Sequence, residues 1–302
     1  MNEGISVKKL SKCFRTISAL SDVSFNVSKG QLFGVLGPDG SGKTTLCRIL
    51  AGILTPDEGE IKIKALDIVK DCEKLKLITG YVPRDYGLYG DLSVGENIDF
   101  YADIFMVPSE DREKRKKQIL DITNLTKFTK RLSAKLSGGM KQKLQLACAL
   151  IHTPEFLILD EPTYGVDPIS RKEFWGLLNE LLAQGITIVL STSYMDEAER
   201  CSEIALLHKG KILKLDKTEN IIASIKGSMF ELICKTPLET AKTLKTLKGV
   251  MKVNVYGDTI HVLTENDEKI ITDTLNKDSL ISLTKINPSI EDCFIYFTEN
   301  AQ

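Results

Sequence analysis

Short apolar runs recur along the first three quarters of the chain, and each has the length of a buried strand. They are Leu32–Leu36, Phe156–Leu159 and Ile186–Leu190. Continuous apolar segments of this length are typical of parallel strands, whose two faces are both covered. Residues 6–27 instead alternate in short segments, which indicates antiparallel strands, and residues from about 86 to 150 have a mainly helical pattern. The pattern predicts an α/β domain with a mixed sheet core, an antiparallel β edge and a helical subdomain.

The pattern changes near Lys226-Gly227-Ser228, which predicts a domain boundary between residues 1–227 and 228–302. The expected order beyond it is strand, helix, strand, strand, helix and strand: Phe230–Cys234, Glu239–Leu247, Val250–Tyr256, Thr259–Leu263, Glu268–Asn276 and Leu280–Ile286. This βαββαβ order is typical of a small ferredoxin-like α+β domain. A last short helix is expected after Ser289, whose hydroxyl can cap it, with Asp292 three residues later.

A glycine-rich segment directly follows the first apolar run. It reads Gly-Pro-Asp-Gly-Ser-Gly-Lys-Thr-Thr and matches the phosphate-loop pattern G-x-x-x-x-G-K-[ST]. Glycines allow backbone amides to surround a polyphosphate, and the following helix directs its positive end at the same anion. Lys43 is expected to reach the β- and γ-phosphates, and the Thr44 hydroxyl to hold magnesium. The predicted ATP-binding residues of the loop are Gly37, Pro38, Asp39, Gly40, Ser41, Gly42, Lys43, Thr44 and Thr45.

Two further motifs carry polar chemistry. Asp160 and Glu161 follow an apolar run, and ligands gather at the carboxyl ends of strands in an open α/β sheet. We expect Asp160 either to bind magnesium directly or to bind one of the groups that coordinate it. We expect Glu161 to polarise an attacking water. The segment Ser137-Gly138-Gly139 opens a predicted helix and is a second candidate anion site. Its distance along the chain from the phosphate loop indicates that it serves a different anion.

The composition narrows the functional classes. Lys and Arg total 40 against 41 for Asp and Glu, which argues against nucleic-acid binding driven by bulk charge. No apolar run reaches the roughly 18 residues that a membrane-spanning helix needs, and the amino terminus lacks the apolar core of a secretory signal. Seven scattered cysteines without a C-x-x-C pair indicate reduced thiols of a cytosolic protein. The charge run at residues 111–117 is expected on a solvated helix face, with a docking patch as the alternative.

Together these motifs resemble the nucleotide-binding subunit of ATP-binding cassette (ABC) transporters, over roughly residues 5–225. Gly37–Thr45 resembles the Walker A loop, Leu136–Gln142 the signature motif, Phe156–Glu161 the Walker B strand with its catalytic glutamate, and Pro162–Asp167 the D-loop. The resemblance implies ATP and Mg²⁺ as ligands. It also implies a head-to-tail dimer, in which each ATP lies between one chain's Walker A loop and the other chain's signature.

This resemblance assigns further roles to single residues. Ser137, Gly138 and Gly139 would contact the ATP that a second subunit holds, and Asp167 would lie in the D-loop. Phe14 matches the aromatic residue that stacks on adenine in the family, although an ordinary core phenylalanine is the alternative.

The carboxy-terminal region resembles the accessory domain that follows the cassette in ATPases of drug, polysaccharide or daunorubicin-type exporters. The similarity is carried by Pro-Ser-Ile-Glu-Asp-Cys-Phe at residues 288–294. It implies a cytoplasmic subunit, peripheral on the inner face of the cell membrane. Its expected partners are a separate integral membrane permease and a second ABC ATPase subunit, identical or different, with no nucleic acid. The alternatives are a weakly hydrolysing, nucleotide-gated cassette and a non-transport soluble ABC ATPase.

Two positions depart from the family pattern. Arg84 stands where the family normally has the glutamine that contacts magnesium and the attacking water, and Ser193 stands where it has the histidine that contacts the γ-phosphate. An arginine cannot ligate a divalent cation, and a serine hydroxyl is too short to replace an imidazole. Both residues belong to the predicted catalytic set with Glu161. Two interpretations remain open. The substitutions are tolerated in a working ATPase, or they mark the weak site in a pair of ATPase subunits.

Overall fold

The computed structural model describes residues 3–265, 268–274 and 280–300. It separates into two compact units, Met1–Leu215 and Asp216–Gln302. The domain boundary near residue 227 that the composition indicates stays a prediction.

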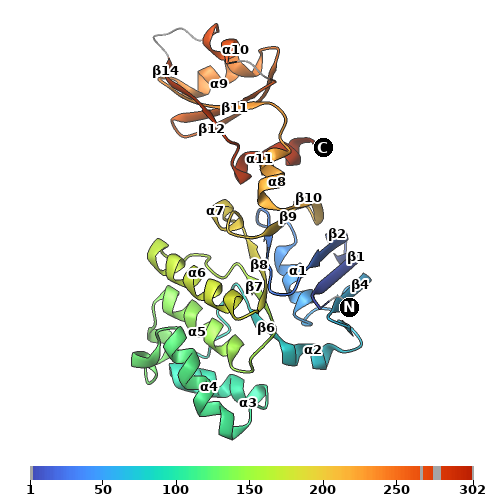
Figure 1. Cartoon of the computed structure of the whole chain (residues 1–302), viewed down its shortest axis with the longest axis vertical. Helices are drawn as coiled ribbons and strands as arrows, with labels where there is room; N and C mark the ends of the chain where they lie inside the picture. Colours follow the sequence, from blue (N-terminus) through green and yellow to red (C-terminus); the bar gives the residue numbers. More distant parts are fainter. Residues whose placement is uncertain (1–2, 266–267, 275–279, 301–302) are drawn as a thin grey trace. The chain divides into compact units, whose positions relative to one another are not determined.

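A six-stranded sheet forms the centre of the first unit, in the order β10-β9-β3-β8-β7-β6 (Figure 1). Its strands are β3 (Leu32–Leu36), β6 (Thr79–Val82), β7 (Phe156–Asp160), β8 (Thr187–Thr192), β9 (Glu203–His208) and β10 (Lys211–Asp216). Strands β9, β3, β8, β7 and β6 pair in parallel. Every residue of β3, β7 and β8 is buried. The parallel strands predicted from the apolar runs are therefore confirmed.

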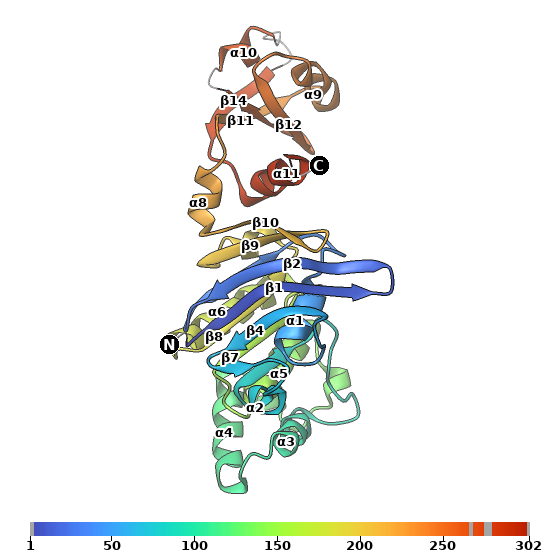
Figure 2. The ribbon, with the colours of Figure 1, turned by 90° about the vertical axis from the view of Figure 1, so that its right-hand side faces the viewer.

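An antiparallel sheet in the order β2-β1-β4-β5 forms a second layer of this unit (Figure 2). Its strands are β1 (Ile5–Phe14), β2 (Ile17–Val27), β4 (Glu58–Ile63) and β5 (Leu66–Asp67). Helix α1 (Lys43–Leu50) packs against β2 as well as β7 and β8. Phe25 of β2 stacks on Phe33 of β3 with ring centroids 4.9 Å apart, so one apolar core joins both sheets. The predicted antiparallel edge is confirmed.

Helices make up the remaining parts of the first unit. They are α2 (Cys72–Ile78), α3 (Val94–Ile104), α4 (Ser109–Ile122), α5 (Gly138–Leu150), α6 (Pro168–Ala183) and α7 (Met195–Ala198), with 3₁₀ turns at Thr126–Phe128 and Ser133–Lys135. A capping box starts α3, because Ser93 accepts from the Glu96 amide and the Glu96 carboxylate accepts from the Ser93 amide. The charge run at residues 111–117 lies on α4, where Arg112 pairs with Asp103 at 2.5 Å.

His152, which lies just after the end of α5, connects α3 to the core. Its ring stacks on Phe105 with centroids 3.8 Å apart, and its Nε2 lies 3.3 Å from the Thr79 carbonyl oxygen. Its Nδ1 is buried without a hydrogen-bond partner among the described residues. Burial lowers the pKa of His152 from 6.5 to about 4.

This low pKa predicts a pH-dependent stability of the first unit. Between pH 6.5 and about 4 the unfolded chain takes up a proton at His152 that the folded chain does not. The free energy of unfolding is therefore expected to fall as the pH falls through this window, by about 3 kcal/mol in total. Urea unfolding of wild type and His152→Gln, followed by the fluorescence of the single Trp175, measures the difference. Parallel stability curves for the two proteins would contradict the expectation.

The second unit holds a four-stranded sheet in the order β12-β13-β11-β14, with all neighbours antiparallel. Its elements are α8 (Thr218–Ala223), β11 (Ser228–Cys234), α9 (Pro237–Lys245), β12 (Val250–Tyr256), β13 (Thr259–Thr264), α10 (Lys269–Thr272), β14 (Leu280–Ile286) and α11 (Ile290–Asn300). From β11 to β14 they follow the predicted βαββαβ order. The predicted helix Glu268–Asn276 reaches residues 275 and 276, which lie outside the described part.

Helix α11 is held by a buried carboxylate. Asp292 accepts hydrogen bonds from the Ser289 amide at 2.9 Å and its hydroxyl at 2.7 Å, and the Ser289 hydroxyl in turn accepts from the Asp292 amide at 3.1 Å. The ring Nδ1 of His261 on β13 lies 3.0 Å from the same carboxylate. The predicted cap at Ser289 is confirmed, whereas the partner from β13 has no signal in the sequence.

Among the described residues, no helix combines the length and apolar character needed to cross a membrane. All seven cysteines lie within the described ranges, and none forms a disulfide.

Candidate nucleotide site

The glycine-rich loop connects the end of β3 to the start of α1, as its position in the sequence predicts. Gly40 and Gly42 have φ values of 77° and 110°, a region that residues with a side chain rarely adopt. A Cβ on Gly42 would lie 2.4 Å from the Ala19 carbonyl oxygen, and one on Gly37 would lie 2.2 Å from that of Leu207. Close packing therefore restricts positions 37 and 42 to glycine, whereas position 40 has open space around it and favours glycine through its backbone conformation alone.

Lys43 points its ammonium group into this loop. The Nζ atom donates to the carbonyl oxygens of Gly37 at 2.7 Å and Pro38 at 3.0 Å, and it lies 2.9 Å from Oε1 of Glu161. The side chains of Lys43 and Glu161 are each 3% exposed. A buried cation surrounded by oxygen acceptors at a helix N-terminus is suited to bind a phosphate, which is a stronger anionic partner than a carbonyl oxygen.

Asp160 ends β7 beneath the loop and fits a magnesium site. It is completely buried, and its Oδ1 accepts from the Thr44 hydroxyl at 3.2 Å and from Ser191 at 2.7 Å. Its Oδ2 and the hydroxyl of Ser41 are buried without hydrogen-bond partners among the described residues. Carboxylate and hydroxyl oxygens are the ligands that Mg²⁺ prefers, together with phosphate oxygens. Thr44 and Asp160 are thus the residues that would hold the ion.

Glu161 takes an unusual backbone conformation directly after β7. Its φ is 46°, and its amide donates to the carbonyl oxygen and to the hydroxyl oxygen of Ser191, each at 3.1 Å. Non-glycine residues in this region often mark functional sites. The conformation aims the carboxylate toward Lys43, where a water next to a terminal phosphate would be activated.

Arg84 reaches the same carboxylate from the end of the neighbouring strand β6. Its Nε lies 3.6 Å from Oε2 of Glu161, and its Nη1 lies 3.4 Å from Oδ1 of Asp39 in the phosphate loop. The guanidinium carbon lies 4.0 Å from the centroid of the Tyr164 ring. Glu161 therefore has a cation on each carboxylate oxygen, Lys43 on one and Arg84 on the other.

A cavity of about 190 Å³ joins these groups. Its lining is Ile17, Ser18, Ala19, Asp39, Gly40, Gly42, Lys43, Thr44, Thr45, Arg84 and Glu161. The first of these residues come from the β1–β2 hairpin, which also carries Phe14. Phe14 is 46% exposed, which argues against an ordinary core phenylalanine, and its role at adenine stays a prediction.

The predicted signature and D-loop residues lie elsewhere and form helix ends. Ser137 caps α5 by accepting from the Met140 amide at 3.3 Å, and a Cβ on Gly139 would lie 2.4 Å from the Ser170 hydroxyl oxygen on α6. Asp167 caps α6 through the amides of Ile169 at 3.1 Å and Ser170. Hydrogen bonds, first from the Ser170 amide, lower the pKa of Asp167. Ser137, Gly138, Gly139 and Asp167 are absent from the lining of the cavity.

Ser193 follows β8 at the same edge of the sheet. The preceding residue, Thr192, accepts through its carbonyl oxygen from the Gly37 amide at 3.3 Å. Ser193 is half-buried but does not belong to the lining of the cavity.

Sequence reasoning missed Glu197, whose buried carboxylate joins several motifs. It accepts hydrogen bonds from Thr163 and from Thr192, the latter at 2.7 Å, and from the Trp175 indole at 3.3 Å. Nε of Arg171 lies 3.8 Å from it. The carboxylate links the segment after Glu161 to the end of β8 and to α6. No pattern in the sequence marks it, because its partners lie 5 to 34 residues away.

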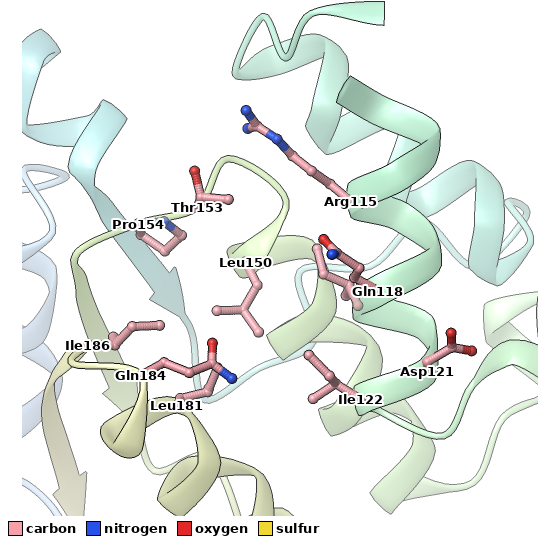
Figure 3. A pocket seen from close by; sticks show the side chains of 11 residues that line it. Arg115, Gln118, Asp121, Ile122, Leu150, Thr153, Pro154, Leu181, Gln184 and Ile186 are labelled. Atoms are coloured by element: carbon pink, nitrogen blue, oxygen red, sulfur yellow. The ribbon is translucent and has the colours of Figure 1, made fainter. Parts of the chain in front are cut away.

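A second pocket, of about 640 Å³, lies away from the phosphate loop (Figure 3). Residues of α4, of the loop before β7 and of the segment between α6 and β8 line it, among them Arg115, Pro154, Gln184 and Ile186. Pro154 and Ile186 precede β7 and β8, so this pocket is at the amino ends of the strands. Ligands of open α/β sheets gather at the carboxyl ends, and the phosphate loop with Glu161 lies there.

Comparison with known proteins agrees with this geometry. The model of the ABC transporter family matches residues 20–164. The chain is similar to the probable multidrug ABC transporter ATP-binding protein YbhF of Escherichia coli, with 38% identity over 92% of this chain and 48% of YbhF. It is also similar to the Nod factor export ATP-binding protein I of Rhizobium etli, with 31% identity over 97% of this chain and 93% of that protein.

Solved structures extend the comparison to the fold. A dimeric ATP-binding cassette, MJ0796, captured in a post-hydrolysis state with ADP and Pi, superposes with a TM-score of 0.65 and 28% identity. The alignment covers 70% of this chain and 98% of that cassette. The chain spans about half the length of YbhF and most of the Nod factor export protein.

Proposed function

This chain belongs to the ATP-binding proteins of the ABC transporter family, and we propose that it binds and hydrolyses ATP to energise a separate membrane-spanning exporter subunit. One observation carries the proposal. Lys43, Asp160 and Glu161 converge at the carboxyl edge of the sheet, with the Lys43 ammonium 2.9 Å from the Glu161 carboxylate. A buried cation, an unpaired buried carboxylate oxygen and a candidate base are the groups that phosphoryl transfer to water requires.

Each of these residues has a separate role in the proposed reaction. The amides of the phosphate loop and Lys43 bind the phosphates of ATP, and Phe14 offers an exposed ring for adenine. Thr44 and Asp160 would hold Mg²⁺, which would neutralise charge on the phosphate oxygens. Glu161 accepts a proton from the attacking water once Lys43 has moved from the carboxylate to the phosphates.

The proposed partners follow from the family. A second ABC ATPase subunit would supply its own signature motif to this chain's ATP. This chain's Ser137, Gly138 and Gly139 would contact the ATP that the second subunit holds, and Asp167 would lie at the same interface. An integral membrane permease would take up the resulting motion, which places the chain peripherally on the cytoplasmic face of the cell membrane. The names of the relatives, with their reference to multidrug transport and to export, support an exporter over a non-transport ABC ATPase.

A second candidate is a weakly hydrolysing cassette that works beside a more active partner in a heterodimer. The observation that favours it is the pairing of Glu161 with both Lys43 and Arg84 in the nucleotide-free chain, because both cations must leave the carboxylate before it can act as a base. Ser193 supports the same interpretation, because it provides no imidazole to contact the γ-phosphate.

The test of the proposed site is Lys43→Ala. Removal of the ammonium deletes charge-assisted contacts to two phosphates, so the affinity for ATP is expected to fall at least about tenfold, and ATP-dependent dimerisation is lost. Titration calorimetry and size-exclusion chromatography with ATP measure the two effects. Lys172→Ala is the matched control, because this exposed lysine lies on α6 outside the cavity. Unchanged affinity and dimerisation in Lys43→Ala would refute the site.

A further inference from the structure

Arg84 holds a position from which it can change partners. Its contacts to Asp39 and Glu161 measure 3.4 and 3.6 Å, longer than the roughly 2.7–2.9 Å of a well-formed charge-assisted hydrogen bond. Asp39 is 68% exposed, so solvent weakens its attraction for the guanidinium. The side chain of Arg84 is itself only 29% exposed. The arginine is therefore enclosed in the site without being fixed to either acid.

Tyr164 keeps the guanidinium at this place. The guanidinium carbon lies 4.0 Å from the ring centroid, which is the geometry of a cation–π contact. The tyrosine is positioned by the turn after β7, where its amide donates to the Glu161 carbonyl oxygen at 3.1 Å. The guanidinium consequently remains in the lining of the cavity whichever anion it binds.

The cavity places Arg84 opposite the groups that would bind phosphate. Arg84, Lys43 and Thr44 line the same space of about 190 Å³, with Gly40 and Gly42 of the phosphate loop. A phosphoryl group carries about 1.5–2 negative charges near neutral pH and presents several acceptor oxygens. A planar guanidinium matches such a group with two parallel hydrogen bonds, which neither present contact provides.

We propose that Arg84 leaves Glu161 and Asp39 when a nucleoside triphosphate binds and contacts its terminal phosphate. This contact makes Arg84 the residue that distinguishes ATP from ADP in this chain, because ADP lacks the phosphate that competes for the guanidinium. In the nucleotide-free and ADP-bound chain the guanidinium stays on Glu161 and keeps this carboxylate paired. The inference rests on the proposed function, since it requires that the phosphate loop binds a nucleotide.

The experiment compares the affinities of two nucleotides. Calorimetric titration of the full chain with magnesium and either ADP or a non-hydrolysable ATP analogue gives the ratio of the two dissociation constants. In Arg84→Gln the preference for the triphosphate is expected to fall about tenfold to a hundredfold, while ADP affinity changes little. Arg84→Lys keeps the charge without the fork and is expected to recover part of the preference.

A matched variant shows whether the loss of an arginine that stacks on an aromatic ring is enough to change the ratio. Arg131→Gln removes a guanidinium that lies 5.8 Å from the Phe128 ring and outside the cavity, so it is expected to keep the wild-type ratio. An Arg84→Gln protein that binds both nucleotides with the wild-type ratio would overturn the inference and leave the proposed function intact. A wild-type chain that binds neither nucleotide would overturn the proposed function and the inference together.

Discussion

Replacement of Glu161 by Gln is expected to lower the ATPase rate by about a hundredfold or more while ATP still binds. The amide has nearly the shape of the carboxylate but cannot accept the proton of the attacking water. The contacts that the phosphate loop and Asp160 would make to ATP do not need this charge, and Lys43 leaves Glu161 for the phosphates, so nucleotide affinity is preserved. Because ATP then persists in the site, the closed dimer is expected to accumulate. Steady-state phosphate release and size-exclusion chromatography with ATP measure the two effects.

A control of the same chemistry separates this effect from a general disturbance. Glu180→Gln changes an exposed glutamate on α6 outside the cavity and is expected to hydrolyse ATP at the wild-type rate. Turnover of Glu161→Gln at the wild-type rate would show that another group activates the water.

The double replacement Arg84→Gln with Ser193→His is expected to raise the ATPase rate of the isolated chain at saturating ATP, by about a hundredfold to a thousandfold. Loss of one transition-state contact typically costs about 2.7–4 kcal/mol, and the double variant restores an amide and an imidazole where the family has them. It also removes the guanidinium that lies 3.6 Å from Oε2 of Glu161 in the nucleotide-free chain. Saturating ATP is required, because the same change weakens the preference for the triphosphate.

The single variants show which departure limits the rate. Arg84→Gln restores the amide without the imidazole, and Ser193→His supplies the imidazole without the amide, so each is expected to gain less than the double variant. Brisk turnover by the wild-type chain, with no gain on restoration, would contradict the weak-site hypothesis. A homodimer with unusual substitutions would then be the better interpretation.

Local patterns predicted most of the fold because they report on neighbouring residues. The apolar runs of β3, β7 and β8 are buried on every residue, as continuous runs of this length indicate. The phosphate loop combines a strand, a turn that only glycines permit and a helix start, all within residues 32–50. In the second unit, the strands Val250–Tyr256 and Leu280–Ile286 have the predicted bounds, since turn residues and the helix cap at Ser289 enclose them.

By itself, the sequence determined the identity of the phosphate-binding loop, the order of the elements and the acids that end β7. The tertiary structure alone decided which side chains meet. The Arg84 guanidinium reaches Glu161 only because β6 and β7 are neighbours in the sheet, and Tyr164 joins them through the turn that follows. Glu197 becomes a buried acceptor only once β8 and α6 have packed around it. Such contacts depend on sheet order and packing, and a linear pattern encodes residue spacing but not the neighbour that folding brings to each side chain.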